Sequence, residues 1–265
     1  MNQLFPETSF AEVPAALKRI KFILAYDGTP FSGFVENRGV TTVAGVLRKN
    51  MEQVLGHQVR LVCAGRTDRG VHAWGQVVSC DVRAGTDIEA LQKSMNMMCR
   101  PHLALRDVTT MPAEFSARFD ATSRTYQYRI LNTAIPNPFL TNTTWRVSRP
   151  LDFRAMQGAV TALLGEHDFT SFCRKQENVS GEIKTRVRNL LRAEWKAESS
   201  EMLVFEVQAT AFCQQMVRSI VGTMADVGLG RMNVADVKVM LESQDRRESA
   251  HVAPPQGLTL WAVGY

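Results

Sequence analysis

The succession of strand and helix patterns in residues 1–113 narrows the choice of fold sharply. Runs rich in β-branched and aromatic residues alternate with segments whose apolar residues recur at helical spacing. The expected strands are 21–28, 59–64, 71–82 and 104–111, and the expected helices are 41–56 and 86–99. The resulting order, β-α-β-β-α-β, is the split βαβ or ferredoxin-like pattern.

Residues 114–265 repeat this kind of order in a looser form. The expected elements are a strand at 124–131, a helix at 151–165, a hairpin at 187–197 and 201–212, helices at 214–228 and 233–243, and a strand at 257–265. No low-complexity linker separates the halves, so we place the boundary near residue 113. We predict an α+β fold of two ferredoxin-like halves, with antiparallel sheets that share a central cleft.

The five cysteines argue against a metal site or a disulfide framework. They are odd in number, widely spaced and never in C-x-x-C spacing. A chain of 265 residues also buries a core large enough to be stable without disulfides or a structural metal. We therefore expect five reduced thiols in a cytoplasmic protein.

Nothing at the N-terminus resembles a signal peptide, because residues 1–21 hold two glutamates and no sustained apolar run. No stretch approaches the ~18 consecutive apolar residues of a membrane span. The sequence therefore predicts a soluble protein without membrane contact.

The chain is basic, with a net charge of +5 and a pI near 9.1, and this weakly favours a polyanionic partner. Lys184, Arg186 and Arg188 alternate in KTRVRN, so on a strand they would share one face. A track for phosphates and a plain solvated face are equally good interpretations of this pattern.

The segment CAGRTDRGVHAWGQVVSC (63–80) holds the best candidates for chemistry. Asp68 sits in a glycine-bounded loop between two apolar strands, where rigid sheets commonly present catalytic groups. An aspartate in a turn more often bonds its own backbone. His72, with His167 and Asp168 as partners, is a candidate general base or metal ligand, although the chain has no H-x-x-x-H or comparable spacing.

GRTDRGVHA (65–73) resembles the active-site loop of the tRNA pseudouridine synthase A family. Five further segments resemble blocks of the same family, in the same order: YDGTPFSGF (26–34), FSARFDATSRTYQYRI (115–130), HDFTSF (167–172), TAFCQQMVRSIVG (210–222) and APPQGLTLWAVGY (253–265). Six such blocks span nearly the whole chain, so chance similarity is a poor explanation.

The resemblance implies an isomerase that converts uridine to pseudouridine at positions 38, 39 and 40 in the anticodon stem and loop of tRNA. It implies no metal, no organic cofactor, a homodimer, and a cleft that binds RNA and flips the target base out. Asp68 matches the family's catalytic aspartate. Its carboxylate would form a covalent adduct with the ring or sugar, or remove a ribose proton to give a glycal, and the sequence leaves both routes open.

The resemblance assigns roles to three more residues. Arg218 matches the arginine that pairs with the aspartate, and a lone cation on so apolar a helix is costly to bury unpaired. Tyr126 matches the tyrosine that stacks on the uracil, although Tyr128 shares its strand face and a core position is the commoner role of tyrosine. Arg66 matches an arginine near the flipped base, with a loop-shaping salt bridge as its alternative.

If the substrate is RNA, the interpretation of the KTRVRN cations as a phosphate-binding track is favoured. Arg188 matches a recurring arginine of the family, and Lys184 and Arg186 would join it in a salt-dependent, sequence-independent grip on phosphates.

The chain departs from the family pattern at positions that carry none of these roles. Phe34-Val35 replace the usual Trp-Gln, Arg69 replaces Ala, and Ser116, Thr210 and Thr259 stand where His, Asn and Tyr are common. These departures bear on tRNA contacts and target position more than on the chemistry.

Two other functions compete with this interpretation. An RNA-binding module without catalysis would follow from an RRM-type fold, but the sequence has no RNP1 motif. A carboxylate-dependent hydrolase of a small nucleoside is the second alternative, and activity on free uridine would favour it.

Overall fold

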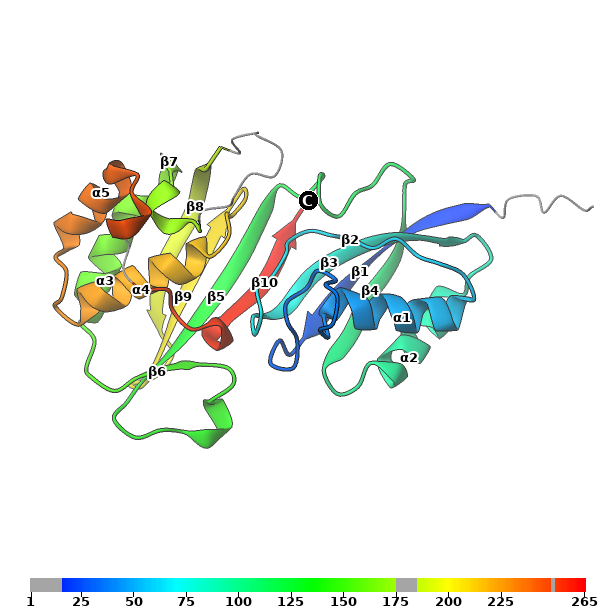
Figure 1. The fold of residues 1–265 in the computed structure, drawn as a ribbon, viewed down its shortest axis with the longest axis horizontal. Coiled ribbons are helices and arrows are strands. Elements are labelled where there is room, and N and C mark those ends of the chain that lie inside the picture. The colour runs from blue at the N-terminus through cyan, green and yellow to red at the C-terminus, as the bar shows by residue number, and fades with distance from the viewer. Residues whose placement is uncertain (1–15, 175–184, 249–250) are drawn as a thin grey trace, which may run out of the picture.

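The computed structural model describes residues 16–174, 185–248 and 251–265, and all of its strands join one sheet (Figure 1). The strands are β1 (Leu17–Tyr26), β2 (Val62–Cys63), β3 (His72–Arg83), β4 (Leu103–Met111), β5 (Ser123–Asn132), β6 (Trp145–Val147), β7 (Gly165–Asp168), β8 (Val187–Ala197), β9 (Met202–Ala209) and β10 (Leu258–Gly264). The α-helices are α1 (Val43–Leu55), α2 (Ile88–Met98), α3 (Phe153–Val160), α4 (Met216–Gly228) and α5 (Val234–Ser243).

The strand order is β4-β1-β3-β10-β5-β9-β8-β7, with β2 beside β3 and β6 beside β5. The C-terminal strand β10 lies in the middle of the sheet, parallel to β3 and antiparallel to β5. We predicted antiparallel sheets, one in each half, whereas the sheet is continuous and has two parallel pairings, β3 with β10 and β5 with β6. A strand left at the edge of each half would expose unpaired backbone groups, and the central position of β10 removes both edges.

Helix α1 shows how closely local sequence determines the elements near the site. The Thr42 side chain accepts a hydrogen bond from the Gly45 N–H at 3.2 Å, and Gly56 ends the helix in the left-handed conformation with φ of 68°. Val43, Leu47 and Met51 recur at a spacing of four and are buried.

The segment 151–165 differs from its prediction as one long helix. Helix α3 ends at Val160, a single 3-10 turn follows, and Gly165 begins strand β7 with a φ of 93°. Glycine adopts this backbone conformation without steric cost, so the chain leaves the helix and pairs with β8.

Helix α4 is buried on nearly all sides, as its apolar sequence predicts. The returning chain passes so close that a Cβ atom on Gly222 would overlap the carbonyl oxygen of His251. This close approach lets the Ala253 N–H donate to the carbonyl of Arg218 at 3.0 Å. None of the described helices is long and apolar enough to cross a membrane.

Candidate active site

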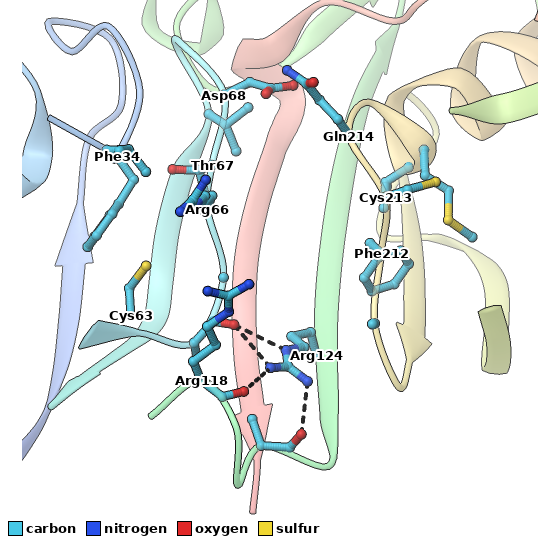
Figure 2. A pocket seen from close by; sticks show the side chains of 18 of the residues that line it. Phe34, Cys63, Arg66, Thr67, Asp68, Arg118, Arg124, Phe212, Cys213 and Gln214 are labelled. Carbon is cyan, nitrogen blue, oxygen red and sulfur yellow. Dashed lines mark hydrogen bonds between the residues drawn. The ribbon is translucent and has the colours of Figure 1, made fainter. Parts of the chain in front are cut away.

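A cavity of about 1380 Å³ has Asp68 in its wall. The loop 65–68, strand β5, the segment 211–215, the start of α4 and the strands β7 and β8 contribute to the lining. Figure 2 shows Asp68 on one side of this space, with its side chain directed toward Gln214 on the other.

Buried hydrogen bonds hold the loop that carries Asp68. The Gln76 amide, fully buried on β3, donates to the Gly65 carbonyl at 2.6 Å and accepts from the Gly65 N–H at 3.2 Å. The hydroxyls of Tyr26 and Thr67 are 2.7 Å apart, and Phe34 N–H donates to the Thr67 carbonyl at 3.1 Å. The loop therefore presents Asp68 from a fixed backbone.

His72 has a structural role in this geometry. Its Nδ1 accepts from the Gly28 N–H at 3.0 Å, so Nε2 carries the proton and donates to the Asn142 carbonyl at 2.8 Å. His167 instead bonds the Leu164 carbonyl within its own segment. Among the described residues, no group of three or more His, Cys, Asp and Glu side chains is arranged to hold a metal ion.

Asp68 and Arg218 are 150 residues apart in sequence and face each other in the cavity. Arg218 Nη1 is 3.4 Å from Asp68 Oδ2, and Arg218 Nε donates to the Ala253 carbonyl at 2.7 Å. The Arg218 side chain is 14% exposed and that of Asp68 is 29% exposed, so the pair is shielded but open to a ligand. The guanidinium is thus anchored at one edge and directed at the carboxylate with the other.

The two tyrosines of β5 have different surroundings in the structure. Tyr128 is fully buried and its hydroxyl donates to the Pro254 carbonyl at 2.7 Å, which is a core role. Tyr126 lines the cavity, packs edge-to-face on Phe212 with ring centroids 5.1 Å apart, and would lie 3.6 Å from a Cβ atom on Gly65. Burial, and then the charge of Asp68, raise the pKa of Tyr126, so its phenol stays neutral.

The buried tyrosines predict a sharp loss of stability at high pH. Burial raises the pKa of Tyr26, Tyr126 and Tyr128. Above pH ~10 the unfolded chain therefore loses three phenolic protons that the folded chain retains, and the free energy of unfolding falls by up to about 4 kcal/mol per pH unit. We expect phenolate absorbance at 295 nm to rise together with loss of the circular dichroism signal. Ionisation of these three tyrosines near pH ~10 while the protein is still folded would contradict this prediction.

Arg124 is a site residue to which the motif comparison gave no role. Its guanidinium donates to the carbonyls of Ala64, Arg118, Ala121 and Thr210, at distances from 2.8 to 3.3 Å (Figure 2). It thereby ties the Asp68 loop to the other wall of the cavity. Burial lowers the pKa of Arg124, and no carboxylate among the described residues pairs with it. The sequence signal was its position two residues before Tyr126, on the same strand face.

Arginines dominate the charge of the cavity wall. Its described lining holds the carboxylates of Glu36, Asp68 and Asp168 and nine arginines: Arg48, Arg60, Arg66, Arg118, Arg124, Arg174, Arg186, Arg188 and Arg218. Such an excess of guanidinium groups favours a ligand with several negative charges, such as a phosphate backbone.

The predicted basic residues fall into three cases. Arg66 is exposed on the cavity wall, and no salt bridge to it occurs in the described part of the chain. Arg186 and Arg188 line the far wall, and the Arg188 Nε is buried without a hydrogen-bond partner among the described residues. Lys184 lies outside the described residues.

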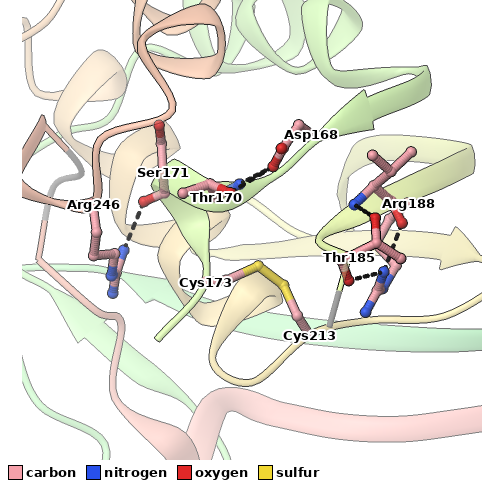
Figure 3. Close-up of a disulfide and its surroundings, with 9 residues drawn as sticks. Asp168, Thr170, Ser171, Cys173, Thr185, Arg188, Cys213 and Arg246 are labelled. Atoms are coloured by element: carbon pink, nitrogen blue, oxygen red, sulfur yellow. Dashed lines mark hydrogen bonds between the residues drawn. A yellow bond between two sulfur atoms is a disulfide. The ribbon is translucent and has the colours of Figure 1, made fainter. Parts of the chain in front are cut away.

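Cys173 and Cys213 form a disulfide beside the cavity, so the expectation of five reduced thiols is wrong for this pair (Figure 3). Their Cα atoms are 5.8 Å apart, within the range that a disulfide spans. Arg174 N–H donates to the Gln214 carbonyl at 3.0 Å, and this contact aligns the two segments. The pairing joins residues 40 apart in sequence, a relation that only folding reveals. Cys63, Cys80 and Cys99 are free.

The disulfide predicts a thiol count and a stability difference. Denatured without reductant, the protein is expected to alkylate at three cysteines, and at five after reduction, by mass spectrometry. Because the closed loop spans 40 residues, reduction should lower the free energy of unfolding by about 4 kcal/mol. A Cys173→Ser/Cys213→Ser variant should not respond to reductant. Five reactive thiols in the unreduced protein would contradict the pairing.

Comparison with known proteins agrees with the motifs of this site. A family profile described as tRNA pseudouridine synthase matches residues 23–120 and 159–265. A protein named tRNA pseudouridine synthase A from Geobacillus sp. (strain WCH70) is 37% identical over 94% of this chain and 98% of its own length. One of the same name from Geobacillus kaustophilus (strain HTA426) is 38% identical over 94% of this chain and 95% of its own.

Solved structures that align with this chain are less similar to it in sequence than these relatives are. A Cbf5-Nop10-Gar1 complex aligns with 90% of this chain and 47% of that chain, at 11% identity and a TM-score of 0.33, which is too low to support a conclusion. The family profile, whose two matched segments include Asp68 and Arg218, and the relatives identify this chain as a member of the tRNA pseudouridine synthase A family and thus as an RNA pseudouridine synthase.

Proposed function

We propose that this enzyme isomerises uridines at positions 38, 39 and 40 in the anticodon stem and loop of tRNA, with Asp68 as the nucleophile. The observation that carries the proposal is the Asp68–Arg218 pair, set beside a neutral, buried Tyr126 in an arginine-rich cavity. A carboxylate held by a guanidinium beside an aromatic ring has the parts needed to activate and hold a uracil nucleotide.

The reaction is an isomerisation and needs no co-reactant. The N1–C1′ bond breaks, the uracil rotates, a C5–C1′ bond forms, and the proton lost from C5 is balanced by one gained at N1. Asp68 opens the route to bond cleavage either by adding to the ring or sugar or by removing a ribose proton. Arg218 holds the Asp68 carboxylate in position, because its Nε is fixed on the Ala253 carbonyl.

Tyr126 is proposed to stack on the flipped uracil. The absence of a side chain on Gly65 leaves an approach to the Tyr126 hydroxyl, and Phe212 fixes the ring from its edge. A neutral phenol suits stacking on a neutral base, because ionisation would place a second negative charge near Asp68.

The arginines of the cavity wall are proposed to hold the RNA. Arg66, exposed next to Asp68, would occupy the space left by the flipped base or grip a neighbouring phosphate. Arg186 and Arg188 would contact phosphates further along, and the Arg188 Nε, which has no partner among the described residues, is a donor that an oxygen ligand can satisfy.

We also infer a homodimer, as the family resemblance implies. We infer action in the cytoplasm from the proposed tRNA substrate, because the Cys173–Cys213 disulfide is contrary to the expectation of five reduced thiols. The proposed domain boundary stays near residue 113, with Asp68 in the first half and both Tyr126 and Arg218 in the second. The matching strand orders β4-β1-β3-β2 and β10-β5-β9-β8 support two ferredoxin-like halves. Light scattering after size-exclusion chromatography tests the dimer, and a monomer at working concentration would contradict it.

The direct test is tritium release from tRNA labelled at uracil C5. Wild-type enzyme should release tritium with multiple turnovers, and release should stop when the anticodon-arm uridines are replaced by cytidines. Free tritiated uridine should give no release. Release that persists after these replacements would move the target elsewhere in the RNA, and the absence of release from a full tRNA pool would overturn the proposed substrate.

A further inference from the structure

Phe119 is an aromatic side chain on the wall of the cavity that no step of the proposed mechanism uses. It is 77% exposed, so its ring is accessible to a ligand. Arg118 lies next to it, with its guanidinium carbon 5.2 Å from the centroid of the Phe119 ring. Both residues line the same cavity as Asp68.

The turn that carries Phe119 is held firmly. Ser116 N–H donates to the Asp120 carboxylate at 3.0 Å, and Asp120 N–H donates back to the Ser116 carbonyl at 3.1 Å. The Arg118 and Ala121 carbonyls both accept from Arg124 at 2.9 Å. The Phe119 ring is therefore exposed on a rigid support.

Arg124 also connects this turn to the catalytic loop. The same guanidinium that holds the Arg118 carbonyl donates to the Ala64 carbonyl, one residue before Gly65. The turn that carries the aromatic ring is thus fixed relative to the loop that presents Asp68. A ring that binds a group next to the reacting nucleotide needs such a fixed position.

The surroundings favour nucleic acid as the ligand of this ring. The cavity has a large excess of arginines over carboxylates, and Arg118 forms no salt bridge with any described residue. An exposed ring next to a guanidinium without an ion-pair partner in the described part of the chain matches a nucleotide, which has a flat base and a phosphate a short distance apart.

We propose that the Phe119 ring is a stacking platform for an unpaired base of the substrate RNA next to the target uridine, and that Arg118 holds the adjoining phosphate. The inference rests on the proposed function, because flipping the uridine leaves its neighbour without a stacking partner. Phe119 replaces that partner and stabilises the opened RNA.

The test uses an anticodon-arm RNA hairpin in which 2-aminopurine replaces the nucleotide on one or the other side of the target uridine. Wild type should quench the fluorescence of one of these hairpins on binding, because stacking on an aromatic ring quenches 2-aminopurine. Phe119→Leu keeps an apolar side chain but removes the ring. It should abolish the quench and weaken binding by about 5- to 100-fold, whereas Phe119→Tyr should retain both.

Phe139 provides the matched control, because it is 95% exposed and does not line the cavity. Phe139→Leu should bind like wild type. Equal quench and affinity for wild type and Phe119→Leu, with both proteins folded by circular dichroism, would overturn the stacking role. These binding measurements do not depend on turnover. A wild type that binds and quenches but releases no tritium would therefore count against the proposed function alone.

Discussion

Replacing Asp68 with alanine is expected to lower the rate of tritium release by at least about 10⁴-fold. The carboxylate is the only one in the described cavity wall that pairs with Arg218, so no neighbouring group can take over its reaction. Binding of tRNA should survive, because the arginines of the wall remain. The measurements are single-turnover release and the tRNA dissociation constant for each protein.

Two variants sharpen this result. Asp68→Asn keeps the size of the side chain and a hydrogen bond to Arg218 but removes the negative charge, so it should be as inactive as Asp68→Ala. Glu36→Gln changes another carboxylate of the same cavity, one that pairs with Arg48, and should keep activity within a few-fold of wild type. Retention of more than a hundredth of wild-type activity by Asp68→Asn would exclude the nucleophile assignment.

Replacing Arg218 with alanine is expected to lower the single-turnover rate by about 10²–10³-fold. The guanidinium bridges the Ala253 carbonyl and the Asp68 carboxylate, and its loss frees the carboxylate to leave its working position. Arg218→Lys restores the charge but has no rigid fork to make both contacts, so we expect a rate between those of alanine and wild type.

A buried arginine can also be needed for folding, so the Arg218 test requires separate measurements. Thermal unfolding is compared for the three proteins, and guanidinium ions are added to Arg218→Ala as a replacement for the missing group. Partial recovery of rate without a change in unfolding temperature supports the positioning role. Arg129→Ala, which removes an exposed surface pair with Glu198, is the control and should not alter the rate. An unchanged rate in a folded Arg218→Ala protein would contradict the role.

The elements near the site follow from local chemistry and were predictable. Apolar residues at helical spacing over 41–56 predicted α1 within two residues at its start, and the structure shows the local causes, the Thr42 cap and the left-handed Gly56. The apolar sequence of 214–228 likewise predicted α4 and made its single arginine conspicuous. The motif GRTDRG, bounded by glycines between strands, identified the loop that lies in the cavity wall.

Only the tertiary structure decided how distant segments meet. The insertion of β10 between β3 and β5, the disulfide from Cys173 to Cys213 and the hydrogen bonds from Arg124 to the Ala64 and Thr210 carbonyls join residues far apart in sequence. The sequence by itself determined the helices, most of the strands and the chemical groups that the chain carries, because caps, turns and apolar spacing act over a few residues. Contacts between distant segments depend on the closure of long loops and on packing, and these leave no pattern in any short stretch of sequence.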